Sequence, residues 1–308
     1  MSARIPYAQY LAAKKTIDDR SLNAGVWTRL ADALPEATER DPLRVLELGC
    51  GIGTMVERCI ECGLLHHAVY TAVDRDAQLI ELARKRLSSR SATQTTSTKR
   101  HPKEQLTLAS LDGSSVKVNF IVGEALEFVR AQIGQERWDL VIAHAFLDLV
   151  DLDIIPDLLK LLEPRRLFYF SLNFAGLTSF LPEIDPTFDE KVFELYHRSM
   201  DARRVEGAQT GGSRTGRKLL ERILAAGADI LQAGASDWVI APRQAGYTTD
   251  EITFLQAIVQ MVQDELHDHP ELDPQAFKRW IEQRRTQIEQ GELVLLTHQL
   301  DILGQRKS

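Results

Sequence analysis

The feature that most constrains this chain is a turn with three alternating glycines, Glu47-Leu-Gly49-Cys-Gly51-Ile-Gly53. The apolar run LRVLELG (43–49) is typical of a buried parallel strand, and we expect a helix from Thr54 to about Cys62. Glycine lets a ligand approach the backbone of such a turn, and the first N–H groups of the helix are free to bind a carboxylate or phosphate. The turn therefore predicts a binding site for a small ligand.

The segment around this turn alternates between strands and helices. Apolar runs predict strands at 68–74, 116–122, 138–144 and 166–174, and helices are expected at 77–87 and from Pro156 to Leu162. The polar stretch 88–104 predicts a mobile surface loop, and 106–123 can hold a hairpin that turns at Asp112–Gly113. Such alternation argues for a parallel sheet with helices on both faces.

The regions outside 43–174 are mainly helical. Helical patterns cover 7–34, 189–200, 215–227, 250–267 and 274–289, whereas 230–242 is a strand or bent strand pair and 292–303 a final strand. We expect an α/β fold with a seven-stranded, mostly parallel sheet whose last strand, 292–303, is antiparallel and pairs beside 230–241. A helical cap would cover the carboxyl ends of the strands, where such sheets bind ligands. It would comprise the N-terminal segment 1–42 and insertions at about 175–213 and 243–291 within the domain 43–308.

Asp74 stands at the end of the second predicted strand, 21 residues after Gly53. A carboxylate there can accept both hydrogen bonds from a ribose diol, so the glycine turn and this acid together indicate a nucleoside-containing ligand. The dinucleotide fingerprint would need its third glycine at position 54, which is Thr54. Glu47, two residues before the first glycine, is badly placed for a pyrophosphate and suits a ligand with an ammonium group.

Four stretches in this order, LELGCGIGT, YTAVDRD, FIVGEALEF and WDLVIAHAFLDLV, resemble the motif series of class I S-adenosylmethionine-dependent methyltransferases. The resemblance covers 43–174 and implies a Rossmann-like fold, an enzyme, and S-adenosylmethionine as the cofactor. Stretches at 7–23, 211–220, 234–242 and 280–304 also resemble a bacterial branch of small-molecule methyltransferases with no known substrate. The resemblance therefore extends the expected fold without naming the acceptor.

The resemblance also implies a set of cofactor-binding residues in the turn and after the next three strands: Glu47, Gly49, Gly51, Gly53, Asp74, Arg75, Glu124, Ala125, His144 and Ala145. Glu47 would contact the methionine ammonium, the glycines would border the methionine and ribose parts, and Asp74 would bind the ribose hydroxyls. Arg75 would flank the adenine, and Glu124, where the family often has Asp, would lie near its amino group with Ala125. His144 and Ala145 would line the wall near the sulfonium.

Two histidines are candidates for a catalytic role. His144 could orient or deprotonate the acceptor, since neutral histidine is a base near pH 7, or it could simply pack against the cofactor. His197, in the predicted helix 189–200, could reach the acceptor or face solvent. Candidate acceptor-binding residues are Tyr10, Phe174, Tyr196 and Arg214. Further basic residues lie near Arg214: Arg203, Arg204, Arg217 and Lys218. A clamp for a carboxylate or phosphate and a solvated surface explain this cluster equally well.

Two clusters could hold a metal: Cys59, Cys62, His66 and His67, and Asp148, Asp151, Asp153 and Asn173. The cysteines fall on the helix after the glycine turn, where cysteine commonly acts as a small buried hydrophobe. The acids precede a predicted helix, and acids there more often cap the helix than bind magnesium. We therefore expect no metal.

The charge and the cysteine content limit the possible partners and compartment. The formal net charge of −7 disfavours a protein that grips phosphate backbones, so we expect no nucleic-acid partner. We find three cysteines, no apolar leader, and no apolar run near the ~20 residues of a membrane span. These features favour the reducing cytoplasm as the compartment.

We expect methyl transfer to an unidentified small molecule by direct displacement, which requires alignment rather than a catalytic triad. The alternatives are a non-enzymatic S-adenosylmethionine-binding regulatory protein and a nicotinamide-dependent oxidoreductase.

Overall fold

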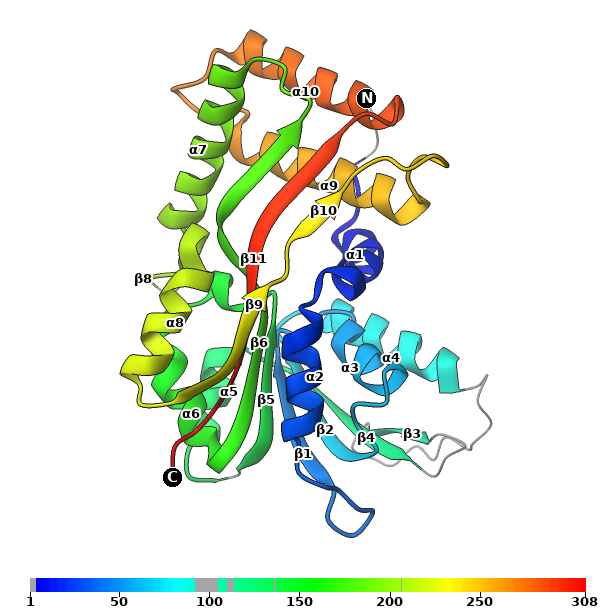
Figure 1. Cartoon of the computed structure of the whole chain (residues 1–308), viewed down its shortest axis with the longest axis vertical. Helices are drawn as coiled ribbons and strands as arrows, with labels where there is room; N and C mark the ends of the chain where they lie inside the picture. The colour runs from blue at the N-terminus through cyan, green and yellow to red at the C-terminus, as the bar shows by residue number, and fades with distance from the viewer. Residues whose placement is uncertain (1–3, 92–104, 110–113, 136, 206) are drawn as a thin grey trace.

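The computed structural model describes residues 4–91, 105–109, 114–135, 137–205 and 207–308. Within them one sheet has nine strands: β1 (Leu43–Leu48), β2 (His67–Asp74), β3 (Gln105–Ala109), β4 (Ser115–Val122), β5 (Trp138–His144), β6 (Leu162–Leu181), β9 (Asp229–Ala235), β10 (Trp238–Ile240) and β11 (Val294–Gln305). Their order is β10-β11-β6-β5-β1-β2-β4-β3, and β9 also pairs with β11 (Figure 1). β1 pairs in parallel with β2 and β5, β2 with β4, and β5 with β6, so the centre of the sheet is parallel, as predicted.

The antiparallel end of the sheet also agrees with the prediction. β11 is antiparallel to β6, β9 and β10, which confirms the pairing expected for 292–303. The predicted number of seven strands is too low, because the hairpin adds β3 and the 230–242 run divides into β9 and β10. The run divides where the side chain of Asp237 accepts the hydrogen bond from the N–H of Gln299 at 3.0 Å, in place of a strand carbonyl.

Helices cover both faces of the sheet, as expected. One face carries α2 (Ala24–Ala33), α3 (Thr54–Glu61) and α4 (Ala77–Ser91), and the other carries α5 (Ala125–Gln132), α6 (Ile155–Leu161) and α8 (Thr215–Ala225). α4 occupies the first residues of the predicted loop 88–104. The rest of that loop and the predicted turn at Asp112–Gly113 lie outside the described residues. None of the helices in the described part of the chain is long and apolar enough to cross a membrane.

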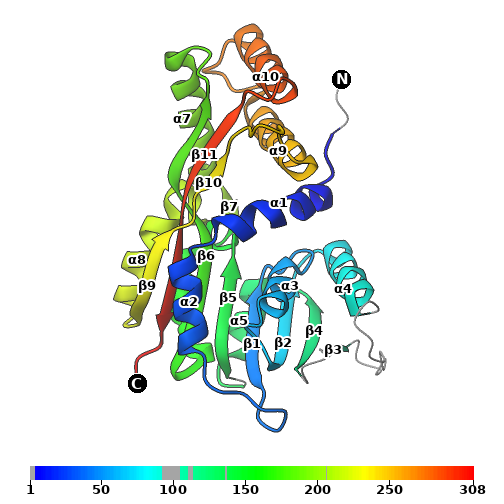
Figure 2. The same ribbon diagram turned by 45° about the vertical axis from the view of Figure 1, so that its right-hand side comes forward.

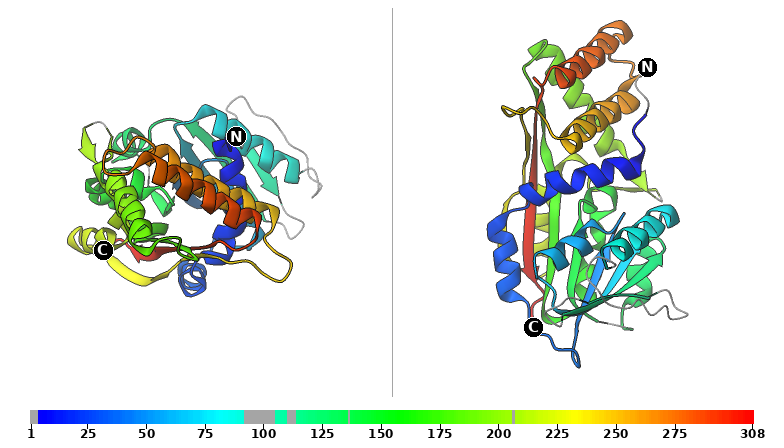
Figure 3. Two further views of the ribbon diagram at one scale, coloured as in Figure 1. Left: turned by 90° about the horizontal axis from the view of Figure 1, so that it is seen from above. Right: turned by 90° about the vertical axis from the view of Figure 1, so that its right-hand side faces the viewer.

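A third apolar core lies among four more helices, which we call the helical cap: α1 (Tyr7–Ser21), α7 (Pro186–Ala202), α9 (Thr249–Leu266) and α10 (Pro274–Glu289). The long strands β6 and β11 run from the main sheet into the cap, where Phe180 and Leu295 join its core (Figures 1 and 3). Within the cap, α1 contacts both α9 and α3, so it lies on the side of the cap that faces the main sheet (Figure 2).

Two predicted boundaries are wrong. The helix expected over 7–34 breaks at Asn23, whose side chain caps α2 by accepting a hydrogen bond from the N–H of Val26 at 3.0 Å. As a result α1 joins the cap, whereas α2 packs on the main sheet. The strand expected at 166–174 extends to Leu181, because residues 177–181 continue to pair with β11.

Candidate functional site

A cavity of about 740 Å³ opens at the carboxyl ends of β1, β2 and β5, between the main sheet and the helical cap. Most of the predicted site residues line it: Glu47, Gly49, Gly51, Asp74, Arg75, Glu124, Ala125, His144, Ala145, Tyr10, Phe174 and Tyr196. Gly53, His197 and Arg214 do not line it. The fold thus brings segments that are far apart in the sequence to one place.

The glycine turn is tied to the end of β2. The N–H of Gly49 donates to the carbonyl of Val73 at 2.9 Å. The N–H of Gly51 donates to Asp74 Oδ2 at 2.8 Å, and Asp74 Oδ1 accepts from the N–H of Asp76 at 2.9 Å. Each carboxylate oxygen has two lone pairs. Asp74 therefore holds the turn in place and still has acceptor sites for a ligand hydroxyl.

The glycines of the turn serve two purposes. The φ angles of Gly49, Gly51 and Gly53 are 71°, 52° and 76°, in the left-handed region that other residues rarely adopt. A Cβ atom on Gly49 would lie 2.3 Å from the ring of Phe146, so this position has no room for a side chain. A Cβ atom on Gly53 would lie 3.2 Å from Ala83 of α4. Gly53 therefore allows α3 to pack closely on α4 and does not form the cavity wall.

Glu47 is a buried carboxylate in this cavity. It is 2% exposed, and Tyr70 donates its hydroxyl to Glu47 Oε2 at 2.8 Å. Burial raises the pKa of Glu47 to about 7, although Tyr70 and Arg58 act in the opposite direction. A cation placed beside Glu47 would lower this pKa again, so the residue can hold a charged amine near neutral pH.

Arg75 and Glu124 face each other at the exposed rim of the cavity. Arg75 Nη1 lies 3.9 Å from Glu124 Oε1, and the two side chains are 72% and 49% exposed. Ala125, the first residue of α5, is buried beneath them. An exposed ion pair of this kind contributes little to stability, so the two side chains can rearrange around a ligand.

His144 belongs to a buried hydrogen-bond network in the cavity wall. Its Nε2 lies 3.2 Å from Asp18 Oδ2, and its Nδ1 lies 2.8 Å from Ser171 Oγ. Asp18 also pairs with Lys14 Nζ at 2.5 Å and accepts from Trp238 Nε1 at 3.1 Å. Because an ionised carboxylate only accepts, His144 donates through Nε2 and accepts the Ser171 hydroxyl at Nδ1.

This network makes His144 a poor base. Burial lowers the pKa of His144 to about 4, since the hydrogen bond to Asp18 only partly offsets the burial. Burial alone would raise the pKa of Asp18, but Lys14 and His144 hold it at about 2. Ser171, His144 and Asp18 have the order of a nucleophilic triad, yet Ser171 is 0% exposed and does not line the cavity. The arrangement favours His144 as a fixed wall residue.

The stability of the folded chain is expected to fall in mild acid because His144 is neutral in the fold. Its pKa is about 4 there, against an ordinary value of 6.5. The unfolded chain therefore binds more protons between these values. The contribution of His144 to the free energy of unfolding is fully present above pH 6.5. It is lost toward pH 4 at up to about 1.4 kcal/mol per pH unit. Chemical denaturation at pH 7.5, 5.5 and 4.5 measures it: His144→Gln should lose less stability on acidification than the wild type. Equal losses would show that another group titrates.

Aromatic side chains form the upper part of the cavity. Tyr10 stacks between Tyr7 and Phe254, with ring centroids 5.8 and 5.5 Å away, so it belongs to the cap core as well as to the cavity wall. Phe174 on β6 and Tyr196 on α7 are half-buried and also line the cavity. Three of the four candidate acceptor-binding residues thus share one cavity, two of them on cap helices.

His197 and Arg214 lie away from this wall. His197 Nε2 is 3.2 Å from Thr178 Oγ1, and the His197 ring packs 5.2 Å from Phe174, behind the cavity lining. Arg214 is exposed just before α8, although its neighbours Ser213 and Thr215 are buried. Of the predicted basic cluster, Arg203 lines the cavity, whereas Arg204 is exposed.

Lys14 and Asp18 were not predicted as site residues. The stretch KKTIDDR contains a signal that could have identified them, since Lys14–Asp18 and Lys15–Asp19 are both spaced by four residues on a helix. Both ion pairs form, and Lys14 and Asp18 are both buried. Lys14 and Asp18 both line the cavity, so buried charges on a cap helix are a signal for residues of the cavity wall.

In each of the two possible metal clusters, one residue has a structural role. Cys59 is buried in the core between α3 and the sheet, while Cys62 is exposed. Asp151 caps the short turn before α6 by accepting from the N–H of Asp153 at 3.0 Å, as predicted from its position. Across the described ranges, no three His, Cys, Asp or Glu side chains converge in a way that could hold a metal ion.

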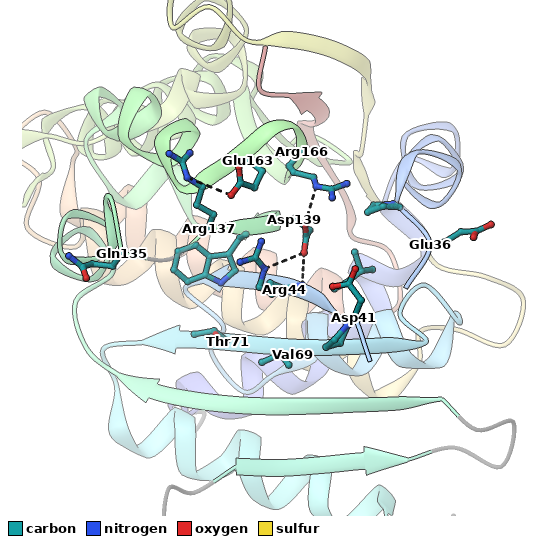
Figure 4. Close-up of a pocket in the computed structure, with 14 residues that line it drawn as sticks. Glu36, Asp41, Arg44, Val69, Thr71, Gln135, Arg137, Asp139, Glu163 and Arg166 are labelled. Atoms are coloured by element: carbon teal, nitrogen blue, oxygen red, sulfur yellow. Dashed lines mark hydrogen bonds and ion pairs between the residues drawn. The ribbon is translucent and has the colours of Figure 1, made fainter. Parts of the chain in front are cut away.

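A second cavity, of about 700 Å³, lies at the opposite edge of the sheet, at the amino ends of β1 and β5 (Figure 4). Its arginines pair with acidic side chains. Asp139 lies 3.0 Å from Arg166 and 3.6 Å from Arg44, and Arg137 lies 3.7 Å from Glu163. This pairing satisfies the arginines without a ligand, so the first cavity is the candidate site.

No protein family model matches the chain. Among curated proteins, it is similar to malonyl-[acyl-carrier protein] O-methyltransferase of Halalkalibacterium halodurans, with 26% identity over 145 residues, or 46% of this chain. The match spans 44% of the length of that relative.

Solved structures that are similar to this one include two S-adenosylmethionine-dependent methyltransferases in complex with S-adenosyl-L-homocysteine. One is from Thiobacillus denitrificans, with 17% identity, 97% of this chain and 99% of that chain covered, and a TM-score of 0.43. The other is from Geobacter sulfurreducens, with 14% identity, coverages of 93% and 92%, and a TM-score of 0.45.

Proposed function

We propose that this chain is an S-adenosylmethionine-dependent methyltransferase that acts on a small molecule. The observation that carries the proposal is the hydrogen bond between the glycine turn and Asp74 in the same cavity as the buried Glu47. The turn gives a ligand access to the backbone, Asp74 suits a ribose diol, and Glu47 suits a cationic amine. The similarity to a curated O-methyltransferase over 145 residues supports the same function.

The cavity residues fit each part of this cofactor. Glu47 would bind the methionine ammonium and Asp74 the ribose hydroxyls, while Arg75 and Glu124 would flank the adenine at the open rim. His144 is held rigidly by Asp18 and Ser171, so it would shape the wall near the sulfonium.

When bound, S-adenosylmethionine would supply a methyl group carried on a positively charged sulfur, which a nucleophilic atom of the acceptor could attack. The residues of the chain contribute by aligning the two molecules and by excluding water beneath the cap.

Binding of the cofactor amine beside Glu47 is expected to release a proton below neutral pH. With a pKa of about 7, Glu47 is mostly protonated at pH 6 before binding, and the arriving cation favours its ionised form. We expect release of close to one proton at pH 6 and about 0.1 at pH 8 from this residue. Calorimetric titration in buffers of different ionisation enthalpy measures the release. The proton release measured with Glu47→Gln is subtracted from that of the wild type, which removes the contribution of the ligand's own amine. Equal release by both proteins would show that Glu47 is not the source of the proton.

A methyl-transfer assay across a metabolite library tests the proposed activity. The expected result is S-adenosylhomocysteine formed in equal amount with one methylated acceptor. Cofactor binding without transfer to any acceptor would instead favour the non-enzymatic regulatory protein. Binding of a nicotinamide cofactor would favour the oxidoreductase, against which Thr54 in the place of a third glycine argues.

A further inference from the structure

Arg203 is a cation in the cavity wall that has no side-chain partner among the described residues. It follows the last residue of α7 and is half-buried, with its side chain lining the cavity beneath the cap. Its backbone is held by two hydrogen bonds, from its N–H to the carbonyl of Met200 and from the N–H of Thr210 to its carbonyl, each 3.3 Å long. Within the described residues, its guanidinium makes no hydrogen bond and no ion pair.

Two arginines that are fully withdrawn from solvent in the described part of the chain are both paired. Arg58 contacts Asp19 at 2.6 Å, and Arg284 contacts Asp189 at 2.6 Å. Removing a charge from water without a partner is costly. A guanidinium that faces a cavity without a protein partner therefore indicates a ligand anion that completes it.

The charges around Arg203 limit what that anion can be. Lys14 is already paired with Asp18, so it does not add a free positive charge. Asp148 lines the same cavity and is close enough to interact electrostatically with Arg203, but the two do not form an ion pair within the described residues. A dianion such as a phosphate would be repelled by Asp148 and would lack a second cation. A singly charged, planar carboxylate matches one guanidinium fork.

Apolar side chains also line this cavity. Phe174, Met200, Ile258, Met261 and Trp238 line it. Such a wall suits a hydrocarbon or aromatic body. Gln299 lines it too and is 2% exposed, and within the described residues its Nε2 has no hydrogen-bond partner. A ligand oxygen would supply the missing acceptor.

We propose that the methyl acceptor is a monocarboxylic acid with an apolar body, whose carboxylate pairs with Arg203 beneath the cap. The proposal rests on the proposed function, because it describes the molecule bound beside S-adenosylmethionine. It assigns Arg203 as the residue that selects acids over uncharged analogues of the same shape.

The test is calorimetric titration of the protein saturated with S-adenosylhomocysteine. The ligands are phenylacetate, benzoate and hexanoate, each compared with its primary amide. At least one acid should bind about tenfold or more tightly than its amide, because charge-assisted hydrogen bonds are lost in the amide. Arg203→Ala should remove this preference, and Arg203→Lys should restore it only in part, since lysine lacks the fork.

Arg204→Ala is the matched control, because Arg204 is the exposed neighbour and donates to the carbonyl of Gly207 at 3.3 Å. It should leave acid binding unchanged, and all three variants should keep the wild-type affinity for S-adenosylhomocysteine. If S-adenosylhomocysteine binds but no acid is preferred over its amide, or if Arg203→Ala keeps the preference, the inference is overturned while the proposed function stands. Failure of S-adenosylhomocysteine itself to bind would overturn the proposed function and the inference with it.

Discussion

Asp74→Ala is expected to weaken binding of S-adenosylmethionine by about 10- to 150-fold. The loss follows from the removal of a charged acceptor, since hydrogen bonds to charged groups are worth about 1.5–3 kcal/mol. Asp74 also accepts from the N–H of Gly51 at 2.8 Å, so the alanine variant additionally frees the glycine turn. Asp74→Asn keeps one carbonyl oxygen for that bond and should show a smaller loss.

Asp41→Ala is a suitable control for this experiment. Asp41 is an exposed acid at the amino edge of the sheet, beside the second cavity and away from the glycine turn. Its replacement should leave the dissociation constant of the cofactor unchanged. Wild-type affinity in Asp74→Ala, with the fold intact by circular dichroism, would remove Asp74 from the site.

Arg284→Ala is expected to lower the free energy of unfolding by about 3–5 kcal/mol, the usual cost of breaking a buried ion pair. Arg284 is 0% exposed, and its Nη2 lies 2.6 Å from Asp189 Oδ1. Its Nη1 donates to the carbonyl of Pro182 at 2.7 Å and to Gln287 Oε1 at 2.8 Å. The alanine variant would leave Asp189 buried with an uncompensated charge, which destabilises the cap.

Denaturant unfolding measures this effect, with Arg279→Ala as the matched control. Arg279 lies on the same helix, α10, but is exposed, so its loss should cost less than about 0.5 kcal/mol. If Arg284→Ala does not fold, the double variant Arg284→Met with Asp189→Leu should recover most of the stability, because both charges are then removed. Similar, small losses for Arg284→Ala and Arg279→Ala would contradict this account of the cap.

The parts of the fold that depend on local sequence could be predicted. The strand before the glycine turn, the helix after it and the acid at the end of β2 carry their signals within a few residues, and all three are present. The starts of α9 and α10 also have local signals, because the side chains of Thr248 and Asp273 cap these helices. Most of the predicted cofactor-binding residues lie in the glycine turn or at the ends of the parallel strands, and these line one cavity.

The parts that depend on distant contacts could not be predicted. His144 and Asp18 are 126 residues apart, and nothing local shows that α1 reaches the end of β5. Asn23 breaks the first helix partly because its side chain also donates to the carbonyl of Ala235 at 2.9 Å, across 212 residues. Gly53 has the same left-handed backbone as Gly49, so only the packing against Ala83 shows that it serves the fold and not the cavity.

Titration calorimetry of the unmodified chain with S-adenosylmethionine, S-adenosylhomocysteine and NAD distinguishes a methyltransferase from an oxidoreductase. We expect S-adenosylmethionine and S-adenosylhomocysteine each to bind with one molecule per chain and to compete with each other, and we expect NAD not to displace them. Binding of NAD in their place, or no binding of either sulfur compound to the folded chain at millimolar concentration, would contradict this expectation.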